Sequence, residues 1–543
     1  MIIVDPVALG DAACTRPSPK WVYNRTGTLV EVPANTLGVT YDPADLSKAP
    51  YALIEPEATN YIRNNTMHGA VVGTPGTKPT FWGYMEGEGG PVLGINSSIV
   101  NKGVERGVEY IDVRYQGVAT ATGTMWIRFE FNNSVPAAVG QKWVHSSFHR
   151  LVSSIGAAPS ISVHLSERNS AGNNLFASDS PALDLTDVLR EYSWEYTLGS
   201  DLVAYVYSGM SFRFISGQAY DFTIRIGLPR LERDRVTSPI KTSGTAITRA
   251  ADVIGSTAGL IYSNVPMVEP PYDAAVTYAK DAAVYDPATK IVYWSMQAAN
   301  VGKPLSDPSW WNKRTAINRW AMFDDRNSTV TSNPEEIIVV ISAKAITQGF
   351  FAGALDASEV RISMTHPTRG VVYSEKRSLV LPRSGSSFYG WCFNRLRMRT
   401  WFRTLKLPVF ANALVTITIL KPGGVPKCGM ALLGPVEDGG STLMGLSTEL
   451  KDYSTTTFFA DGSSDTVVRG FSKRMSVDVS VERDRVESLE DYFVKRRQKT
   501  LVIFGSTLRG DGMLVGKVSS FRKVIDSYPR SKMALQIEGV LSQ

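Results

Sequence analysis

Apolar and polar residues alternate one by one along most of the patterned segments of this chain. In residues 124–131 one face would carry Met125, Ile127, Phe129 and Phe131, and the other face would carry Trp126, Arg128 and Glu130. The same alternation recurs in residues 220–226, 415–419 and 477–481. A period of two residues is typical of an antiparallel strand with one buried face. Because turn-forming residues rather than long helical patterns separate these segments, the sequence predicts an all-β fold of several antiparallel, jelly-roll-like β-sandwich domains.

Helical spacing of apolar residues is rare in this sequence. Residues 486–498 show it, with acidic residues in the first turns and basic residues in the last, which complements the helix dipole. A shorter helix is predicted over residues 182–190. We therefore expect one or two short helices in an otherwise β-sheet protein.

Proline and glycine mark the expected domain borders. Pro266, Pro270 and Pro271 indicate a linker, because proline fixes φ and cannot donate to a strand ladder. A second break is expected in residues 421–427, which follow a predicted strand. The sequence then divides into an N-terminal segment, a jelly-roll domain, a Pro-rich linker, a second β-sandwich and a C-terminal β-rich domain with one helix, over residues 1–50, 51–255, 256–275, 276–425 and 426–543.

Length and composition exclude several classes of protein. The 543 residues suffice for about three or four domains, and 43% hydrophobic with 20% charged residues is an ordinary globular composition. No apolar run approaches the roughly 18 to 20 residues of a membrane helix, so we expect no membrane insertion and an unprocessed chain. Three scattered cysteines, Cys14, Cys392 and Cys428, are read as buried thiols of a protein made in a reducing cytoplasm.

The net charge of +6 is unevenly distributed. Residues 391–543 hold 23 Lys or Arg against 15 Asp or Glu, whereas residues 1–390 have a net charge of −2. Such asymmetry suggests a polyanionic neighbour near the C-terminal part, whether nucleic acid, phosphorylated polysaccharide or an acidic protein surface.

No motif specifies catalysis. His145 and His149 would share one side of a helix and could bind metal, but the Glu of a metalloprotease is missing, so a structural or surface role is favoured. Asp324 and Asp325 could be the acid and base of a glycosidase only across a sugar-binding cleft, and a turn after a buried aromatic pair is favoured. We therefore expect a non-enzymatic protein with no catalytic residue, no bound metal and no cofactor.

The most suggestive stretch is basic and aromatic, residues 391–407. In a strand, Arg395, Arg397 and Arg399 would line one face, with Trp401 close by, a combination that can grip phosphates and stack on sugars. A subunit interface with acidic residues opposite is the favoured alternative. The candidate contacts to a glycan or a neighbouring subunit are Trp126, Arg128, Arg395, Arg397, Arg399 and Trp401.

Two segments that flank the predicted jelly roll carry a resemblance to a known family. ALIEPEATNYIRNN (residues 52–65) and VTSPIKTSGTAITRAADVI (residues 236–254) resemble the paired flanks of a module of tailed-bacteriophage tail and fibre proteins. Residues 13–43 resemble the segment that precedes this module. The resemblance implies a jelly roll similar to carbohydrate-binding modules within residues 51–255, preceded by an N-terminal attachment segment over residues 1–50.

A second resemblance covers the C-terminal part. NRWAMFDD at residues 318–325 and later short motifs, ending with SKMALQIEGVL at residues 531–541, are similar in order to the C-terminal region of phage virion proteins of the tail or tail tip. This implies a virion protein synthesised in the host cytoplasm. The implied partners are other copies of the chain in a homo-oligomer, expected to be a trimer, other tail proteins, and host surface polysaccharide or lipopolysaccharide, but not nucleic acid.

Three functions remain open at this point. The favoured one is a structural protein of the phage tail, tail tip or tail fibre that helps attachment to host surface glycans through multivalent contacts. The alternatives are a tail-borne polysaccharide depolymerase or esterase and a purely architectural cement protein of the tail or baseplate. Sizing of host polysaccharide after incubation with the protein, and a glycan array, would separate them.

Overall fold

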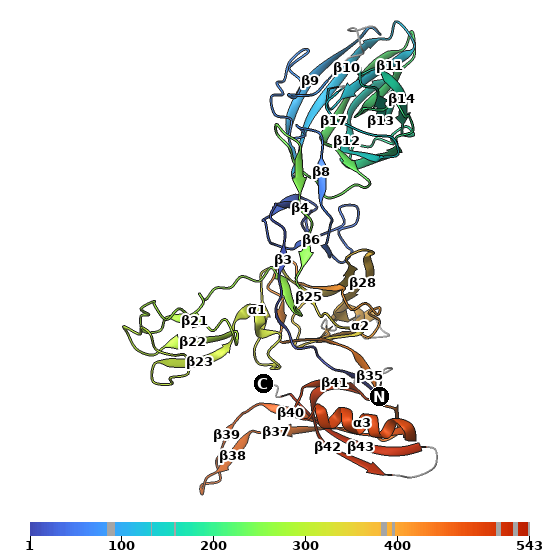
Figure 1. The fold of residues 1–543 in the computed structure, drawn as a ribbon. Helices are drawn as coiled ribbons and strands as arrows, with labels where there is room; N and C mark the ends of the chain where they lie inside the picture. The colour runs from blue at the N-terminus through green and yellow to red at the C-terminus, as the bar shows by residue number, and fades with distance from the viewer. Residues whose placement is uncertain are drawn as a thin grey trace. The chain divides into compact units, whose positions relative to one another are not determined.

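The computed structural model describes residues 1–83, 93–131, 133–156, 159–381, 388–393, 397–506, 512–524 and 530–540. It confirms the all-β prediction, because antiparallel sheets form nearly all of the regular structure and the helices are short (Figure 1). The chain divides into two compact units. The jelly-roll unit contains Cys14–Leu46 and Leu53–Ile254, and the terminal unit contains Met1–Ala13, Ser47–Ala52 and Gly255–Gln543.

The jelly-roll unit is a sandwich of two antiparallel sheets (Figure 1). The five-stranded sheet has the order β15 (Arg190–Thr197), β12 (Lys142–Gly156), β17 (Ala219–Arg233), β10 (Val108–Val118) and β9 (Ile95–Glu105). The four-stranded sheet has the order β11 (Gly123–Arg128), β16 (Tyr205–Phe214), β13 (Ser160–Arg168) and β14 (Asn174–Asp179). Alternate residues of both sheets, such as Ile127, Phe212 and Ile224, meet in one buried core.

Two predictions for this unit need correction. The alternation in residues 124–131 buries Met125, Ile127 and Phe129 as predicted, but β11 ends at Arg128 and Phe131 is 50% exposed. Residues 182–189 are not helical, because their apolar side chains pack at a spacing of two: Leu183 and Leu185 both contact the sandwich core. The Leu183 backbone N–H donates to the Ile161 carbonyl, so this segment runs along the sandwich in an extended form.

The flanks of the jelly roll lie side by side, as their resemblance predicts. Strand β8 (Ala58–Asn60) pairs with β18 (Ile247–Arg249). Residues 14–46 belong to the same compact unit, with β3 (Cys14–Thr15) paired to β19 (Val253–Ile254) and β4 (Lys20–Tyr23) paired to β5 (Leu29–Val32). The segment expected to be separate over residues 1–50 is therefore divided, and most of it packs with the jelly roll.

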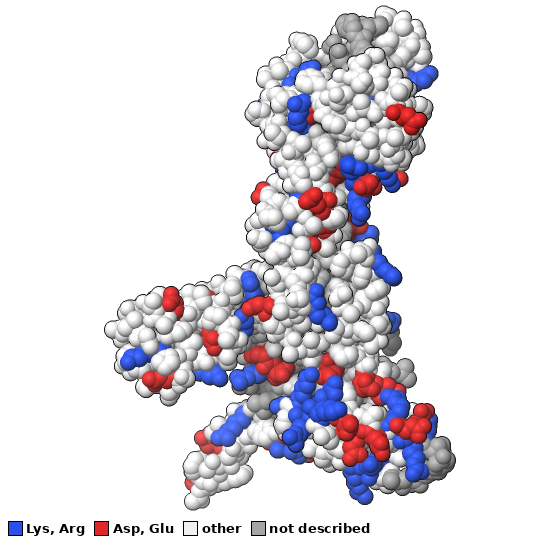
Figure 2. All heavy atoms as spheres, in the orientation of Figure 1, with Lys and Arg blue, Asp and Glu red and all other residues white. Residues whose placement is uncertain are grey.

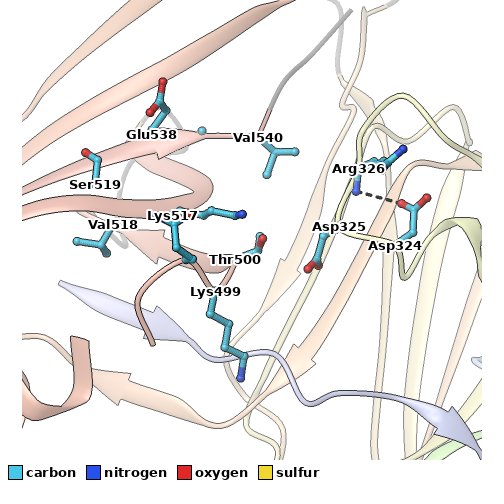
Figure 3. Close-up of a pocket in the computed structure, with 12 residues that line it drawn as sticks. Asp324, Asp325, Arg326, Lys499, Thr500, Lys517, Val518, Ser519, Glu538 and Val540 are labelled. Atoms are coloured by element: carbon cyan, nitrogen blue, oxygen red, sulfur yellow. Dashed lines mark hydrogen bonds between the residues drawn. The ribbon is translucent and has the colours of Figure 1, made fainter. Parts of the chain in front are cut away.

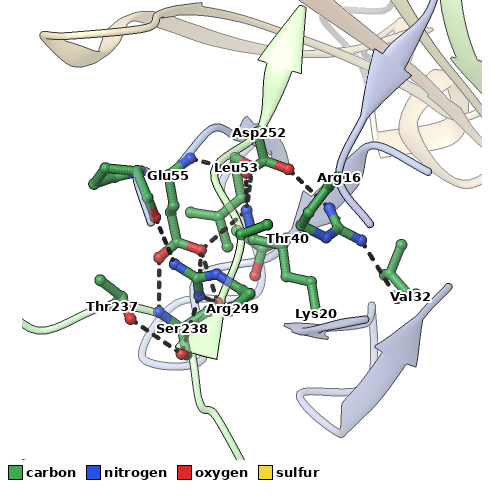
Figure 4. A network of polar contacts seen from close by, with 12 residues as sticks. Arg16, Lys20, Val32, Thr40, Leu53, Glu55, Thr237, Ser238, Arg249 and Asp252 are labelled. Carbon is green, nitrogen blue, oxygen red and sulfur yellow. Dashed lines mark hydrogen bonds and ion pairs between the residues drawn. The ribbon is translucent and has the colours of Figure 1, made fainter. Parts of the chain in front are cut away.

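A buried ion network joins these flanks (Figure 4). Asp252 accepts hydrogen bonds from Arg16 Nη1 at 2.8 Å and from Lys20 Nζ at 2.6 Å, and all three side chains are fully buried. Glu55 pairs with Lys20 at 2.9 Å and with Arg249 at 3.0 Å. Although burial opposes ionisation, Lys20 and Arg249 hold the pKa of Glu55 below its ordinary value. The residues that carry the family resemblance thus form the electrostatic anchor of this unit.

The terminal unit contains a second sandwich. Its six-stranded sheet has the order β2 (Gly10–Asp11), β20 (Gly259–Ser263), β25 (Glu336–Ser342), β32 (Leu414–Leu420), β27 (Glu359–His366) and β28 (Gly370–Ser378). A three-stranded sheet of β31 (Phe402–Thr404), β26 (Gly349–Gly353) and β34 (Met430–Gly434) packs against it. Strand β20 lies within residues 256–275, so part of the predicted linker is sheet.

The terminal unit also contains a smaller sheet, two short helices and several short strands next to this sandwich in the sequence. A three-stranded sheet of β21 (Ala283–Tyr285), β22 (Ile291–Ser295) and β23 (Trp311–Ala316) has its own aromatic cluster. The short helices are α1 (Asn318–Ala321) and α2 (Phe388–Phe393). The remaining short strands here are β24 (Thr331–Ser332), β29 (Val380–Leu381), β30 (Arg397–Met398) and β33 (Lys427–Cys428), while β6 (Gly38–Thr40) and β7 (Tyr51–Leu53) occur earlier in the chain.

The last part of the terminal unit is a sheet covered by the predicted helix. The order is β35 (Val436–Asp438), β1 (Ile2–Val4), β41 (Leu501–Phe504), β42 (Met513–Val524), β43 (Arg530–Gly539), β40 (Phe471–Glu482) and β36 (Ser441–Thr442), and β37 (Ser447–Asp452) also pairs with β40. Helix α3 (Arg483–Lys495) buries Val486, Leu489 and Phe493 against this sheet. The helix predicted over residues 486–498 is confirmed, displaced by three residues.

Candidate functional site

Trp126 and Arg128 lie on the outer face of the four-stranded sheet of the jelly-roll unit. In β11 their neighbours Met125 and Ile127 point into the core, so the two candidate residues face the opposite side. Trp126 is half-buried and pairs in register with Ser211 of β16, whereas Arg128 is almost fully buried. The sequence thus placed both residues on the correct face, but Arg128 is not the solvated residue that simple alternation predicts.

Next to Trp126 is a chain of polar groups centred on His164. The Trp126 and His164 rings have their centroids 6.3 Å apart. His164 Nδ1 lies 2.7 Å from Asp179 Oδ1, and its Nε2 lies 2.9 Å from the Tyr207 hydroxyl. The Ser211 hydroxyl donates to the same Asp179 oxygen at 3.0 Å. These bonds hold the imidazole in one orientation between a carboxylate and a phenol.

Asp179 is the exposed end of this chain. Its side chain is 49% exposed, while that of His164 is 4% exposed. Burial opposes ionisation, but the hydrogen bond and charge of His164 outweigh it and hold the pKa of Asp179 below its ordinary value. At neutral pH the site therefore offers an ionised, correctly oriented acceptor beside a half-buried indole.

Two buried guanidinium groups pack on the Tyr207 ring. The carbon atoms of the Arg128 and Arg168 guanidiniums lie 4.9 Å and 4.5 Å from the Tyr207 ring centroid, within cation–π distance. The surface named here the Trp126 face therefore combines a half-buried indole with the partly exposed carboxylate of Asp179, which the buried His164 and Ser211 hold in place. Such a set suits a sugar, because the ring covers an apolar sugar face while the fixed carboxylate bonds hydroxyls.

A second row of aromatic residues, which was not among the candidates predicted from the sequence, lies on the edge strand β15. Tyr192, Trp194 and Tyr196 alternate there and are half-buried against the sandwich core. Trp194 Nε1 donates to the Ser178 hydroxyl of β14 at 3.1 Å, and the Tyr196 ring stacks on Phe176 with centroids 5.8 Å apart. The alternation in REYSWEYT, residues 190–197, is the signal that predicts this row. This aromatic row closes the gap between the edges of the two sheets, because β15 belongs to one sheet and β14 to the other.

His145 and His149 lie in strand β12 rather than on a helix. Both are fully buried, and the Ser147 hydroxyl lies 2.6 Å from the Nε2 atom of each. Burial lowers the pKa of His149 to about 3 and lowers that of His145 well below its ordinary value. Both side chains are therefore neutral parts of the sandwich interior, which agrees with the favoured structural reading. Among the described residues no cluster of His, Cys, Asp and Glu could hold a metal ion.

The basic stretch does not form the predicted continuous strand. Arg395 lies outside the described residues. Arg397 is exposed in β30, which is only two residues long and pairs with the equally short β29. Arg399 lies beyond this strand with its guanidinium carbon 4.9 Å from the Trp401 ring centroid. The structure therefore does not bring these arginines together on one strand face, but it does place Arg399 against Trp401.

A pocket lined by charged residues lies in the terminal unit (Figure 3). Its volume is about 690 Å³, and it is lined by the turn after α1 and by residues next to or within β41, β42 and β43. The charged lining residues are Asp324, Asp325, Arg326, Lys499, Lys517 and Glu538. Asp324 and Asp325 thus occupy the predicted turn after a buried Trp320, and the pocket is the part that the sequence did not reveal.

Both aspartates of this pocket ionise less readily than usual. Partial burial raises the pKa of Asp324, although two contacts from Thr329, at 2.8 and 2.7 Å, oppose the rise. Burial also raises the pKa of Asp325, and the negative charge of Asp324 adds to this effect while Lys517 opposes it. Both signs of charge face the same cavity, so it is suited to a polar ligand with hydroxyl groups.

Comparisons with known proteins found no matching family model and no matching curated protein. Among solved structures, a family 4 carbohydrate-binding module is 20% identical with a TM-score of 0.21, over 32% of this chain and 99% of the other. The CBM22-1 xylan-binding domain of Paenibacillus barcinonensis Xyn10C is 12% identical with a TM-score of 0.21, over 33% and 94%. The enzymatically active domain of tailspike protein 4 of bacteriophage CBA120 is 10% identical with a TM-score of 0.17, over 28% and 19%. These scores are too low to determine the function of this chain.

Within the described part of the chain, no helix is long and apolar enough to cross a membrane.

Proposed function

We propose that this chain is a non-enzymatic structural protein of a bacteriophage tail, tail tip or tail fibre whose jelly-roll unit binds host surface glycans. The sequence resemblance of the flanks and of the C-terminal motifs supports the tail assignment. The observation that carries glycan binding is the Trp126 face, where an indole lies beside the ordered His164–Asp179 pair. Preorganised polar groups next to an aromatic ring bind sugars without the cost of ordering flexible side chains.

Single glycan sites of this open kind are weak, and several copies on one virion make them effective. Linked sites raise the overall affinity through effective concentration rather than through new contacts. The proposed role therefore includes a homo-oligomer, and host polysaccharide or lipopolysaccharide is the proposed ligand. This agrees with a site that offers a half-buried indole and one partly exposed carboxylate rather than a strong anion-binding site.

The test is a titration of purified full-length protein with host surface polysaccharide, compared with Trp126→Ala and Asp179→Asn. Each substitution should weaken binding roughly fivefold or more, because a stacked ring or a charge-assisted hydrogen bond contributes about 1 to 3 kcal/mol. Val104→Ser, at an exposed position of the other sheet, is the matched control and should leave binding unchanged. Wild-type protein that binds no host glycan, or a Trp126→Ala variant with full affinity, would contradict the proposal.

A second candidate function is favoured by one observation, the pair of aspartates with raised pKa in the terminal-unit pocket. A carboxyl group whose pKa is raised holds its proton more readily, as the general acid of glycoside hydrolysis must. Shortening of host polysaccharide by wild-type protein, abolished in Asp325→Asn, would favour this depolymerase. Intact polysaccharide after long incubation would leave the binding function as the better account.

A further inference from the structure

A two-stranded ribbon extends from the C-terminal sheet without covering any part of it. Within the described ranges, strand β38 (Thr455–Phe458) pairs with β39 (Ser464–Val467) and with no other strand, and the two continue the paired strands β37 and β40. Figure 1 shows this ribbon projecting beyond β37, away from β42 and β43. An isolated two-stranded ribbon is at best marginally stable in water, and both of its edges remain open to pairing.

The ribbon exposes large apolar side chains that a free surface element does not need. Phe458 is 79% exposed and Val468 is 82% exposed, and strand alternation from the pair Phe458 and Ser464 puts both on one face. Val467 lies on the other face and Phe459 directly follows β38, and each is 53% exposed. In Figure 2 the surface of this projection is largely uncharged. Exposed apolar surface concentrated on one projecting element indicates a contact with another molecule.

A groove that could accept these side chains lies in the same unit. It has a volume of about 330 Å³, and its lining residues are Trp401, Thr448, Glu449, Leu450, Lys473, Met513 and Leu514. Leu450 is 58% exposed there. An aromatic ring and aliphatic side chains at one groove match the Phe and Val side chains of the ribbon in chemistry.

The charges of ribbon and groove are complementary. Residues 453–468 contain Asp461 and Asp465 but no Lys or Arg. In the groove, Lys473 and Glu449 balance each other, and the Arg399 and Arg403 guanidiniums flank Trp401 at 4.9 and 5.8 Å from its ring. A negative ribbon thus meets a positive groove. Such complementarity specifies the partner and speeds the encounter.

We propose that the β38–β39 ribbon of one copy docks in the Trp401 groove of a second copy of this chain. The ribbon cannot reach the groove of its own copy, because β37 forms part of that groove and leads directly into the ribbon that points away from it. The contact joins two different surfaces, so its repetition gives a ring of copies where the rotation closes and an open filament where it does not. This inference does not depend on glycan binding.

Light scattering on the full-length protein tests the contact. Wild-type protein should be an oligomer at micromolar concentration, and Phe458→Ser with Val468→Ser should convert it to a monomer. Leu450→Asp, which alters the groove, should do the same. All three positions are strongly exposed, so the far-UV spectrum and the melting temperature should be unchanged. Val104→Ser, an equally exposed apolar position in the jelly-roll unit, should retain the wild-type mass.

Mixing the two variants gives the sharper result. The Leu450→Asp copy keeps its ribbon and the Phe458→Ser, Val468→Ser copy keeps its groove, so together they should form a complex of two 59.4 kDa chains that cannot grow further. Charge reversal of Asp461 and Asp465 to Lys should also dissociate the oligomer, and Arg399→Glu in the partner copy should restore association. A wild-type monomer, an oligomer that survives loss of the ribbon side chains, or variants that do not associate on mixing would each overturn the proposal.

Discussion

The buried network of the jelly-roll unit and the pocket of the terminal unit use the same residue types in opposite ways. In the network, Arg16, Lys20 and Asp252 are fully buried and satisfy one another at 2.6 to 2.8 Å. In the pocket, Asp325 and Lys517 face a cavity of about 690 Å³ and are accessible to solvent. One cluster holds chain segments together, and the other leaves polar groups available to a ligand.

The difference teaches that charge alone does not indicate a site. A buried pair is costly to break because the remaining partner loses its compensation, whereas an open pair contributes little to folding. Opposite shifts of pKa follow from this: Lys20 and Arg249 lower that of Glu55 despite burial, while burial raises that of Asp325. Substitutions in the two clusters should therefore separate stability from binding.

The largest effect is expected from Asp252→Asn. This change leaves Arg16 and Lys20 buried with one carboxylate fewer, which should destabilise the jelly-roll unit by about 3 to 5 kcal/mol. Hydrogen exchange of the full-length protein should show lost protection in peptides of residues 53–254 but not in those of residues 336–434. Asp221→Asn breaks a more exposed pair with Arg114, which solvent screens, and should have a much smaller effect. Equal effects of the two substitutions would contradict the contrast.

The second-largest effect is expected from acidification, which should lower the stability of the jelly-roll unit. The folded-state pKa of His149 is about 3, far below the unfolded value near 6.5, so the unfolded state binds more protons between these limits. Stability should fall as pH decreases below about 6.5, by about 1.4 kcal/mol per pH unit for each buried histidine. Urea unfolding at several pH values should show this slope, and it should decrease in His149→Gln. His366→Gln is the control in the terminal unit, and an unchanged slope in the first variant would contradict the assignment.

A smaller effect of opposite sign is expected in the pocket. Burial raises the pKa of Asp325, so its ionised form opposes folding, and this opposition is removed as pH falls through the raised pKa. Asp325→Asn should leave the stability of the terminal unit unchanged or slightly increased, within about 0.5 kcal/mol, because the residue is exposed to the pocket. A fluorescence-monitored melt measures this. A marked loss of stability would show that Asp325 belongs to the supporting structure.

The smallest effects are expected from the isolated arginines. Arg397→Ala removes an exposed side chain and should change stability by less than about 0.5 kcal/mol. Arg399→Ala also removes the contact with the Trp401 ring, which is worth about 0.5 to 1 kcal/mol at such a site. Chemical unfolding of both variants side by side should rank them in this order. The reverse order would show that the Trp401 contact has no energetic role.

Much of the fold could be predicted from the alternation of apolar and polar residues. The strand predicted over residues 220–226 lies within β17, and the one over residues 477–481 lies within β40. Alternation failed where polar residues are buried by distant partners. Glu130 is buried because the Arg63 side chain and backbone N–H bond its carboxylate at 2.6 to 3.2 Å, and Arg63 is 67 residues away. A local pattern contains no information on such a partner.

The candidate site could be predicted from the sequence only in part, for the same reason. Trp126 was singled out, but His164 and Asp179, which complete its surface, are brought to it by the pairing of β13, β14 and β16. The pocket collects residues from four separate segments of the terminal unit, and the motifs in two of them, residues 318–325 and 531–541, do not reveal that they meet. The spacing of His145 and His149 was misleading because residues four apart share a face in a strand as well as in a helix.

The position of β1 has a consequence for synthesis on the ribosome. Ile2–Val4 is made long before its two neighbours in the sheet, β35 and β41, which begin at Val436 and Leu501. At about 5 to 20 residues per second, this strand waits on the order of 25 to 100 s for its second neighbour. During this delay Ile3, fully buried in the finished protein, has no sheet to cover it. The C-terminal sheet is therefore a late step of biogenesis, whereas the jelly-roll unit can fold while translation continues.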